Sequence, residues 1–519
     1  MSGRTATTHG AAPSIANKQA DACWGNPMRL ASIVLLSCLA AGAHAQTQAP
    51  EPLTPYQWQQ QQKVAFETSE RIYADALKRN GLLAQYKAMR DAYRGDKNEA
   101  FRIVFGQYLS WYQSFVGDYI GAHGSYSIRQ LAAKDDATSP LTADYSAKPA
   151  LDAIAELAKD RKAVFFNEAH NVPLTRSLTV QLLSRLRAEG YTYFAAETLY
   201  QSDGDLQKRG YAIEKSGFYT LEPISAEMVR TAIKLGFKVV AYESEKEGNG
   251  DVREFDQAKN LYERVFKVDP NARLVVNAGY AHIQENGRYL GGKSMAQHFR
   301  RLADIDPLTI EQTMLIDHPR GTENHPFYTA VIESLHPAAP IVFEDKSGQP
   351  WTLKPKSYDV SVVFPPDQVR DDRPTWLDLG GLRKPYYVNG GLCQGDFPCL
   401  IEARYANEGN DAIPADRLVL ALVESNAGLD GRLITGHGDA HGDLYLRPGR
   451  YRLTATNDSN RTVSSQEITI DENAPGVLPG VSAPAKDGHA EVDSSHGRSC
   501  AAKLALPAAL QSNAACDAH

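Results

Sequence analysis

The sequence predicts an α/β protein with a mostly parallel sheet core, a helical N-terminal region and a C-terminal β-sandwich-like domain. Between residues 150 and 345, short apolar runs alternate with amphipathic helical stretches, which is typical of parallel βαβ units. Before residue 150, apolar residues recur at helical spacing. From residue 386 onward, short alternating runs are separated by turn-rich stretches, as in an antiparallel β domain.

Composition excludes several classes of protein. The chain has 519 residues and a net charge of -7, so it lacks the basic footprint of a nucleic-acid-binding protein. With 43% hydrophobic and 23% charged residues it has the composition of a globular protein rather than a disordered one. A mean hydropathy of -0.40 argues against a polytopic membrane protein.

The first 45 residues contain the pattern of a leader and signal peptide. Arg29 precedes an apolar run over residues 30–41, and the small residues Ala43-His44-Ala45 follow it. We therefore expect cleavage after Ala45 and export to the periplasm or the extracellular space. Met28 is an alternative start of translation. A second interpretation is lipidation of Cys38, which would give an outer-membrane lipoprotein and the only expected contact with a membrane.

Cysteine usage fits an exported protein. Removal of the leader leaves Cys393, Cys399, Cys500 and Cys516, and an even number in an oxidising compartment suggests disulfides. Cys393 and Cys399 flank Gln-Gly-Asp-Phe-Pro, a turn-forming stretch that could bring them together, and the other pair would follow by elimination. Free thiols are the alternative, more plausible for Cys500 and Cys516.

Residues 46–149 are expected to form a linker and a helical region. A helical pattern stops near Asn80-Gly81, where glycine favours the end of a helix. A later stripe of aromatic residues lies on one helix face: Tyr108, Trp111, Tyr112, Phe115 and Tyr119. Such periodicity usually means burial, so we favour packing onto the next domain over a wall that stacks on a ligand.

The central domain, residues 150–345, contains four expected strands and three expected helices. The strands are residues 163–167, 191–196, 237–242 and 273–278, and the helices are residues 175–188, 226–234 and 252–268. Each strand is followed by a titratable residue: Glu168 and His170, then Glu197, Glu243 and His282. Because the carboxyl ends of parallel strands share one edge of the sheet, these groups should meet in one crevice.

The motifs at these strand ends resemble those of a known family. They are Phe-Asn-Glu-Ala-His at 166–170, Tyr-Phe-Ala-Ala-Glu at 193–197, Arg-Glu-Phe-Asp-Gln-Ala-Lys-Asn at 253–260 and Asn-Ala-Gly-Tyr-Ala-His at 277–282. Together they resemble the Tiki/TraB superfamily, which groups erythromycin esterases with ChaN-like haem-binding proteins. The resemblance covers about the central third of the chain.

The resemblance implies a set of functional residues. Its Gly-Glu-x-His start, downstream acid, arginine-led helix and late Gly-x-x-His correspond to Glu168, His170, Glu197, Arg253 and His282.

Two departures from the family pattern weigh against esterase activity on macrolides. Asn167 stands where the family usually has glycine, and Glu168 and His170 are one residue closer than in the erythromycin-esterase pattern.

Several chemistries are open for this cluster. In a hydrolase acting on a small molecule or a peptide, His170 or His282 would take a proton from water, Glu168 or Glu197 would orient the imidazole, and Arg253 would stabilise the oxyanion. The same nitrogen and oxygen donors could hold a divalent metal whose ligands would be Glu168, His170, Glu197 and His282.

The main non-enzymatic alternative is haem binding, which the resemblance allows. Tyr280, Tyr242 or His282 would then be the axial ligand. A cell-surface interaction protein that keeps the fold without catalysis is a third class. The intact set of acids and histidines weighs mildly against it.

The remaining segments carry weaker signals. Residues 346–385, which include the apolar run 360–364, are expected to form an irregular connection, and the tail 473–519 has the composition of a disordered segment. Asp317, His318 and His325 are assigned to a surface loop.

In the small β domain, residues 386–472, strands are expected at 399–405, 417–423, 451–455 and 467–470. Arg447-Pro448-Gly449-Arg450 predicts a hairpin turn between two strands. Just before it, four residues alternate with small ones and are explained by an exposed turn rather than a metal loop: His437, Asp439, His441 and Asp443.

Overall fold

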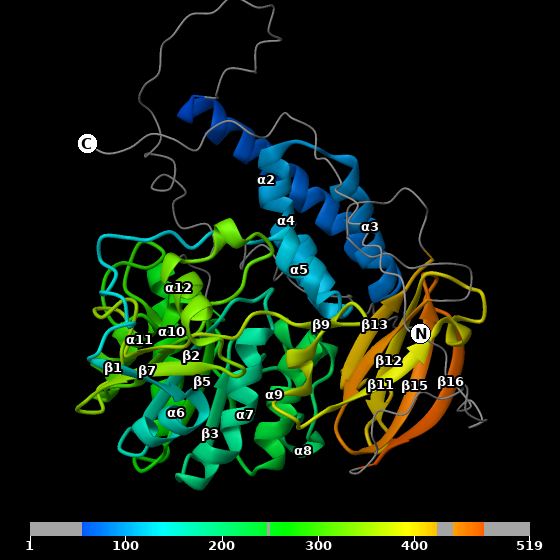
Figure 1. Ribbon diagram of the computed structural model, residues 1–519. Coiled ribbons are helices and arrows are strands. Elements are labelled where there is room, and N and C mark those ends of the chain that lie inside the picture. Colours follow the sequence, from blue (N-terminus) through cyan, green and yellow to red (C-terminus); the bar gives the residue numbers. More distant parts are fainter. Residues whose placement is uncertain (1–53, 246–249, 423–439, 472–519) are drawn as a thin grey trace, which may run out of the picture. The chain divides into compact units, whose positions relative to one another are not determined.

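The computed structural model describes residues 54–245, 250–422 and 440–471 (Figure 1). The expected signal peptide with Cys38, the expected disordered tail, and Cys500 and Cys516 lie outside these ranges. Across the described part of the chain, no helix is long and apolar enough to cross a membrane.

The N-terminal region is helical, as the periodicity predicts. It comprises α2 (Pro55–Leu77), α3 (Leu82–Gly95), α4 (Glu99–Phe115) and α5 (Tyr119–Ser125). A capping box formed by Thr54 and Gln57 begins α2. Gly81, with a φ of 91°, separates α2 from α3 and confirms the expected stop near this position.

The aromatic stripe of α4 is buried, which confirms packing over a ligand-stacking wall. Trp111 and Phe115 meet Phe218 of the central domain edge-on, with ring centroids 5.3 Å and 5.4 Å apart. These contacts join the helical region to the α/β core.

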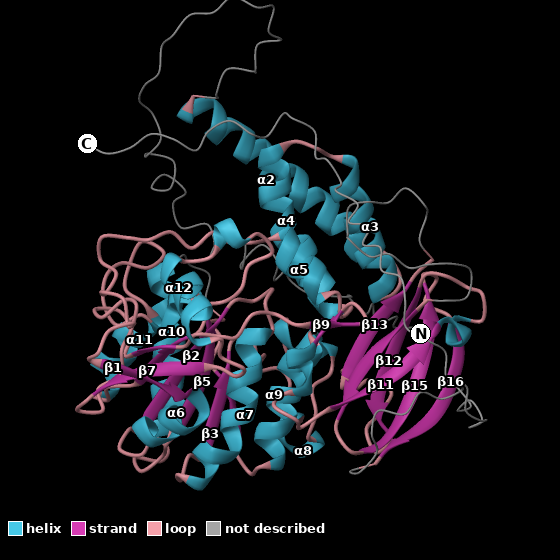
Figure 2. Ribbon diagram, in the orientation of Figure 1, coloured by secondary structure: helices cyan, strands magenta, loops and turns pink. Residues whose placement is uncertain are grey.

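The central domain is built on a parallel sheet that includes β2, β3 and β5 (Figures 1 and 2). The sheet has six strands in the order β4-β3-β5-β2-β6-β8. Its strands are β2 (Ala163–Glu168), β3 (Tyr193–Ala196), β4 (Lys238–Ala241), β5 (Leu274–Gly279), β6 (Leu308–Glu311) and β8 (Val360–Ser361). The first four confirm the expected strands. The last two, which are four and two residues long, were not expected from the sequence. Residues 360–361, which we expected in an irregular connection, therefore form an edge of the sheet.

Helices cover both faces of this sheet, which explains its uninterrupted apolar strands. Val164 and Phe166 share a core with residues of α6 (Ala150–Ala158), α7 (Leu174–Ala188) and α9 (Pro223–Lys234). Phe165, between them in sequence, packs on the opposite face, where the core includes residues of two further helices. Those helices are α10 (Gly250–Leu261), which continues as a π-helical turn over Tyr262–Phe266, and α11 (Met295–Ala303).

Smaller elements complete the domain. β1 (Tyr145–Pro149) pairs antiparallel with β7 (Ile341–Asp345), and β9 (Val369–Arg370) pairs with β10 (Arg373–Pro374). The short helices are α8 (Leu206–Arg209) and α12 (Pro326–Leu335), with 3-10 turns at Glu214–Ser216, Tyr219–Leu221, Tyr280–Ile283, Gly321–Glu323, Thr375–Asp378 and Gly390–Cys393.

The C-terminal domain consists of two antiparallel sheets with a shared core, as expected for a β-sandwich (Figure 2). β11 (Lys384–Asn389) pairs with β14 (His441–Leu446). The second sheet has the order β13-β12-β15-β16. Its strands are β12 (Cys399–Tyr405), β13 (Asp416–Leu420), β15 (Gly449–Asn457) and β16 (Thr462–Ile470).

The prediction of a hairpin at residues 447–450 is wrong. β14 precedes this turn and pairs with β11, whereas β15 follows the turn and pairs with β12 and β16. The turn therefore leads from one sheet to the other. Turn residues identify a change of direction, but which strand pairs with which depends on the tertiary packing.

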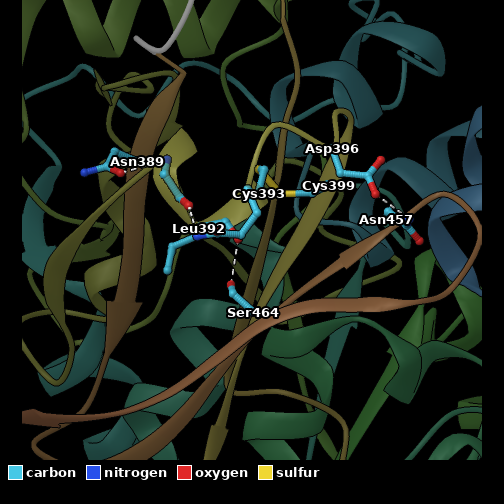
Figure 3. The surroundings of a disulfide bond; sticks show 9 residues. Asn389, Leu392, Cys393, Asp396, Cys399, Asn457 and Ser464 are labelled. Carbon is cyan, nitrogen blue, oxygen red and sulfur yellow. Dashed lines mark hydrogen bonds between the residues drawn. A yellow bond between two sulfur atoms is a disulfide. The ribbon is translucent and has the colours of Figure 1, made fainter.

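Cys393 and Cys399 form a disulfide, which confirms the pairing suggested by the turn between them (Figure 3). Both cysteines are fully buried. Nearby, Ser464 Oγ donates a hydrogen bond to the Leu392 carbonyl at 2.6 Å, and Asn457 Nδ2 donates to Asp396 Oδ2 at 2.8 Å. The loop between the cysteines is thus held against β15 and β16.

Candidate functional site

The carboxyl ends of three neighbouring strands, together with helix α10, bring the five predicted residues into one cluster. Glu168 ends β2, Glu197 follows β3, and His282 follows β5. His170 lies two residues beyond β2, and Arg253 reaches the cluster from α10. Their exposed fractions range from 2% to 9%, so the cluster is buried. The sheet topology therefore confirms the expected convergence of these side chains.

Glu168 is held in its ionised form by a buried arginine. Arg176, on α7, donates from Nη2 to Oε1 at 2.6 Å and from Nε to Oε2 at 2.8 Å. Asn277 Nδ2 also donates to Oε2. Burial opposes ionisation, but Arg176, followed by His170, lowers the pKa of Glu168 to about 2.

His170 is oriented by this carboxylate. Its Nδ1 lies 3.0 Å from Glu168 Oε1, and because Glu168 is ionised, Nδ1 must carry the proton and donate it. In the neutral imidazole, Nε2 is then the free basic nitrogen. The ring stacks on Tyr219 at a centroid distance of 4.0 Å and meets Tyr280 edge-on at 5.1 Å. Three neighbours thus restrict the ring.

Gly279, the last residue of β5, makes room for this arrangement. A Cβ atom on residue 279 would collide with Cε1 and Nε2 of His170 and would lie 2.9 Å from Glu197 Oε2. Its backbone N–H donates to Glu197 Oε2 at 2.6 Å. Glycine is required here by close approach, since its φ of -74° is ordinary.

Glu197 stands between the two histidines. Its Oε2 lies 3.9 Å from His170 Nε2, and its Oε1 lies 3.4 Å from His282 Nε2. Arg253 Nη2 donates to Oε1 at 2.8 Å. Burial opposes ionisation, but His282, His170 and Arg253 hold the pKa of Glu197 well below its ordinary value.

Arg253 joins this carboxylate to a second one. It donates from Nε and Nη2 to the two oxygens of Glu243, at 2.9 Å and 2.8 Å, while Nη1 faces His282 Nε2 at 3.3 Å. Glu243, which follows β4, therefore belongs to the cluster as its strand-end position predicted. The guanidinium group is engaged in this arrangement, so an oxyanion would have to share it with two carboxylates.

His282 is a cation in this site. Its Nδ1 lies 2.8 Å from Glu254, a fully buried residue of α10, and its Nε2 faces Glu197. Burial alone would lower the pKa of His282, but the carboxylates of Glu254 and Glu197 raise it to about 10. A histidine that stays protonated at neutral pH cannot be the general base.

Four site residues were missed by the sequence analysis: Arg176, Glu254, Asn277 and Gly279. Arg176 had a detectable signal, because it shares a face of α7 with the buried Val180 and Leu183, and a charge within an apolar stripe needs a buried partner. Glu254 follows Arg253 directly, but only packing shows that it turns toward His282.

The donors do not fit a divalent metal in this arrangement. In the described ranges, no group of three or more His, Cys, Asp or Glu side chains is placed to hold a metal ion. Of the four residues proposed as ligands, Glu168 is engaged by Arg176 and Glu197 by Arg253. An arginine in this position satisfies the oxygens that a metal would use.

The candidate haem ligands fit no better. The two nitrogens of His282 face Glu254 and Glu197. Tyr242 is fully buried, and its hydroxyl donates to the carbonyl of Asn277 at 3.2 Å. Tyr280 lines a pocket of about 220 Å³. That volume is below the roughly 300–1,000 Å³ typical of pockets for drug-sized ligands.

This pocket, which we call the inner pocket, lies beside the cluster. Its wall includes Ala169 and Asn171, which flank His170, and Tyr280, which packs against the His170 ring. The hydroxyl of Tyr280 donates to Asn171 Oδ1 at 3.4 Å. Most of the exposed lining is apolar. The inner pocket therefore lies next to residues that flank His170 and pack against its ring.

The other predicted polar residues lie apart from the cluster. His325 caps α12 and is 3.2 Å from Asp136. Of the four residues that we assigned to an exposed turn, His441 and Asp443 instead lie on β14, where Asp443 is buried and its Oδ2 pairs with Arg370 at 2.9 Å. His437 and Asp439 lie outside the described residues. His318, which we assigned to a surface loop, is instead buried and lines the inner pocket.

The comparison with protein families found no match, and neither did the comparison with curated proteins. Among solved structures, the type III effector HopBA1 is 13% identical over 35% of this chain and 95% of its own, with a TM-score of 0.25. RRSP, a MARTX toxin effector domain from Vibrio vulnificus, is 15% identical over 44% of this chain and 51% of its own, with a TM-score of 0.24.

A further similar structure is the C-terminal region of Pasteurella multocida toxin, described as having a thiol-protease-like catalytic triad. It is 9% identical over 76% of this chain and 50% of its own, with a TM-score of 0.23. The chain thus spans about half the length of this toxin structure and of RRSP. TM-scores this low do not indicate a shared function, so the functional conclusion depends on the site itself.

Proposed function

We propose that this chain is an exported hydrolase of the Tiki/TraB superfamily, of the erythromycin-esterase-like type, which cleaves an ester or amide bond in a small molecule or a peptide. One observation supports this most directly. His170 Nδ1 lies 3.0 Å from Glu168 and donates to it, so that Nε2 faces Glu197 at the ligand-binding edge of a parallel sheet. This is the arrangement that a general base needs.

The gap between His170 Nε2 and Glu197 Oε2 suits a nucleophilic water molecule. At 3.9 Å the two acceptors are too far apart for a direct hydrogen bond, and one water could donate a hydrogen bond to each of them. Nε2 would take one proton as the water oxygen attacks the carbonyl carbon. The protonated imidazole would then return that proton to the leaving oxygen or nitrogen, which completes the hydrolysis.

The other charged residues have supporting roles in this proposal. Glu168 stabilises the imidazolium that forms on His170, as the acid of a catalytic triad does. His282 and Arg253 keep Glu197 ionised and oriented. Because the carboxylates are engaged by arginines, no step passes through a metal ion or haem.

Turnover of a panel of esters and peptides by the purified full chain tests this function. His170→Ala should lower kcat by about 10²–10⁴-fold, the usual contribution of a general base. His441→Ala, in the C-terminal domain, is the matched control and should leave kcat unchanged. Equal turnover by His170→Ala and the wild type, with both folded, would overturn the assignment.

Export is tested separately from activity. Mass spectrometry of the protein recovered from the periplasm or the medium should find Gln46 as its first residue. A diacylated Cys38 at the N-terminus would instead support the lipoprotein interpretation.

A further inference from the structure

A second pocket of about 220 Å³ adjoins the inner pocket. The two share His123, Val172 and His318 in their walls. The second pocket adds two carboxylates and an aromatic wall, and we call it the acidic pocket. The carboxylates are those of Asp317 and Asp367, and the aromatic wall is formed by Tyr119 and Trp376.

The two carboxylates have no cationic partner. Among the described residues, neither Asp317 nor Asp367 forms an ion pair. Asp317 accepts hydrogen bonds only from neutral groups, Asn324 Nδ2 at 3.2 Å and the backbone N–H of Asp367 at 3.3 Å. Burial, followed by the charge of Asp317, raises the pKa of Asp367 to about 7. Asp367 therefore ionises in mildly alkaline solution, next to Asp317 and without a cationic partner among the described residues.

The shared wall presents hydrogen-bond acceptors. His123 is 8% exposed, and its ring forms no hydrogen bond with any described residue. Burial, followed by the proximity of His318, lowers the pKa of His123 to about 3, so the ring is neutral and has one acceptor nitrogen. The His318 ring centroid lies 5.4 Å from that of His123. An imidazole on a pocket wall without a hydrogen-bond partner in the protein is available to accept a hydrogen bond from a ligand.

The residues that line the two pockets suit a cation rather than an anion. Of the described residues that line them, none is lysine or arginine. Trp376, whose ring packs against Tyr119 at 5.4 Å, offers an indole surface of the kind that attracts organic cations. The acidic pocket thus combines carboxylates, a neutral acceptor and an aromatic ring. The described lining of the inner pocket contains no Asp, Glu, Lys or Arg.

We propose that the acidic pocket binds a positively charged amine of the substrate, and that the inner pocket holds the apolar part of the same molecule next to His170. The site thereby selects esters or amides that carry an ammonium group. The link to the reaction rests on the proposed function, but binding of the cation does not, because Asp317, Asp367 and His123 lie outside the catalytic cluster.

Calorimetric titration of the full chain at pH 8 tests the proposal, with benzylamine as the cationic probe and benzyl alcohol as its neutral counterpart. Benzylamine should bind saturably and at least about tenfold more tightly than benzyl alcohol. Asp367→Asn and Asp317→Asn should each weaken benzylamine binding by about tenfold or more, the effect of losing one charge-assisted hydrogen bond. The exposed Asp144→Asn is the matched control and should bind like the wild type.

The two proposals can fail separately. If benzylamine and benzyl alcohol bind equally, or if both aspartate variants bind benzylamine like the wild type, the amine site is wrong even if hydrolysis is observed. If His170→Ala binds benzylamine normally while no ester or amide is turned over by the wild type, the amine site stands and the hydrolase assignment fails. If the amine site and the hydrolase assignment are both correct, benzylamine should inhibit hydrolysis competitively.

Discussion

Glu168 Oε1 lies 3.0 Å from His170 Nδ1, although only one residue separates the two in sequence and both side chains are almost fully buried. β2 ends at Glu168, and the chain beyond it bends so that both side chains meet at the sheet edge. Since Glu168 is ionised, this contact determines which nitrogen of His170 carries the proton, and therefore which one can act as a base.

The Glu168–His170 contact predicts the effect of Glu168→Gln. A neutral amide cannot stabilise the imidazolium and can present its NH₂ group to Nδ1, which would favour the wrong tautomer. We expect kcat to fall by about 10²–10⁴-fold with little change in KM. Steady-state kinetics on the substrate found in the panel measures this. A change confined to KM would contradict the orienting role.

Gly279→Ala should displace the base without removing it. The added Cβ would collide with the His170 ring, so turnover should fall by at least about 10²-fold while His170 is still present. Gly204→Ala is the control, because a Cβ at that position meets no atom within 4 Å. Full activity in Gly279→Ala would show that the position of His170 does not matter for the reaction.

His282 predicts a pH dependence of stability. Its pKa is raised from 6.5 to about 10 in the folded protein, so its contribution is complete below pH 6.5 and is lost as the pH rises through about 10. The difference in free energy of unfolding between wild type and His282→Gln should thus shrink over this interval, by at most about 1.4 kcal/mol per pH unit. Urea unfolding at several pH values measures it. A difference that grows with pH would contradict a protonated His282.

Arg176 predicts a large loss of stability. It is completely buried and pairs with Glu168 and Glu222, so Arg176→Met removes the buried cation that both carboxylates share and should cost about 3–5 kcal/mol. Arg185→Met is the control on the same helix. Its exposed pair with Asp152 should contribute only about 0–1 kcal/mol. Chemical denaturation of both variants gives the comparison, and equal losses would refute a special role for Arg176.

Much of the site could be predicted because it depends on strand ends. Apolar runs followed by Glu168, Glu197 and Glu243 locate the ends of β2, β3 and β4 without any knowledge of packing. Parallel strands then place those residues at one edge. β8 could not be found in this way, because two residues contain no periodicity and are recognised only by their neighbours in the sheet. β6 is as long as β3 and β4, but Thr309 interrupts its apolar residues, so no continuous apolar run marks it.

The sequence by itself determined the parallel α/β core, the helical and β domains around it, the Cys393–Cys399 pair and the five residues that meet at the site. Only the tertiary structure decided their roles. Glu254 and Glu197 together make His282 a cation. Glu168 instead accepts the Nδ1 proton of His170, so that Nε2 is the nitrogen available to act as a base. Both histidines follow strands and look alike in sequence. A pKa depends on which charges lie within a few ångströms after folding, and those partners come from distant parts of the chain.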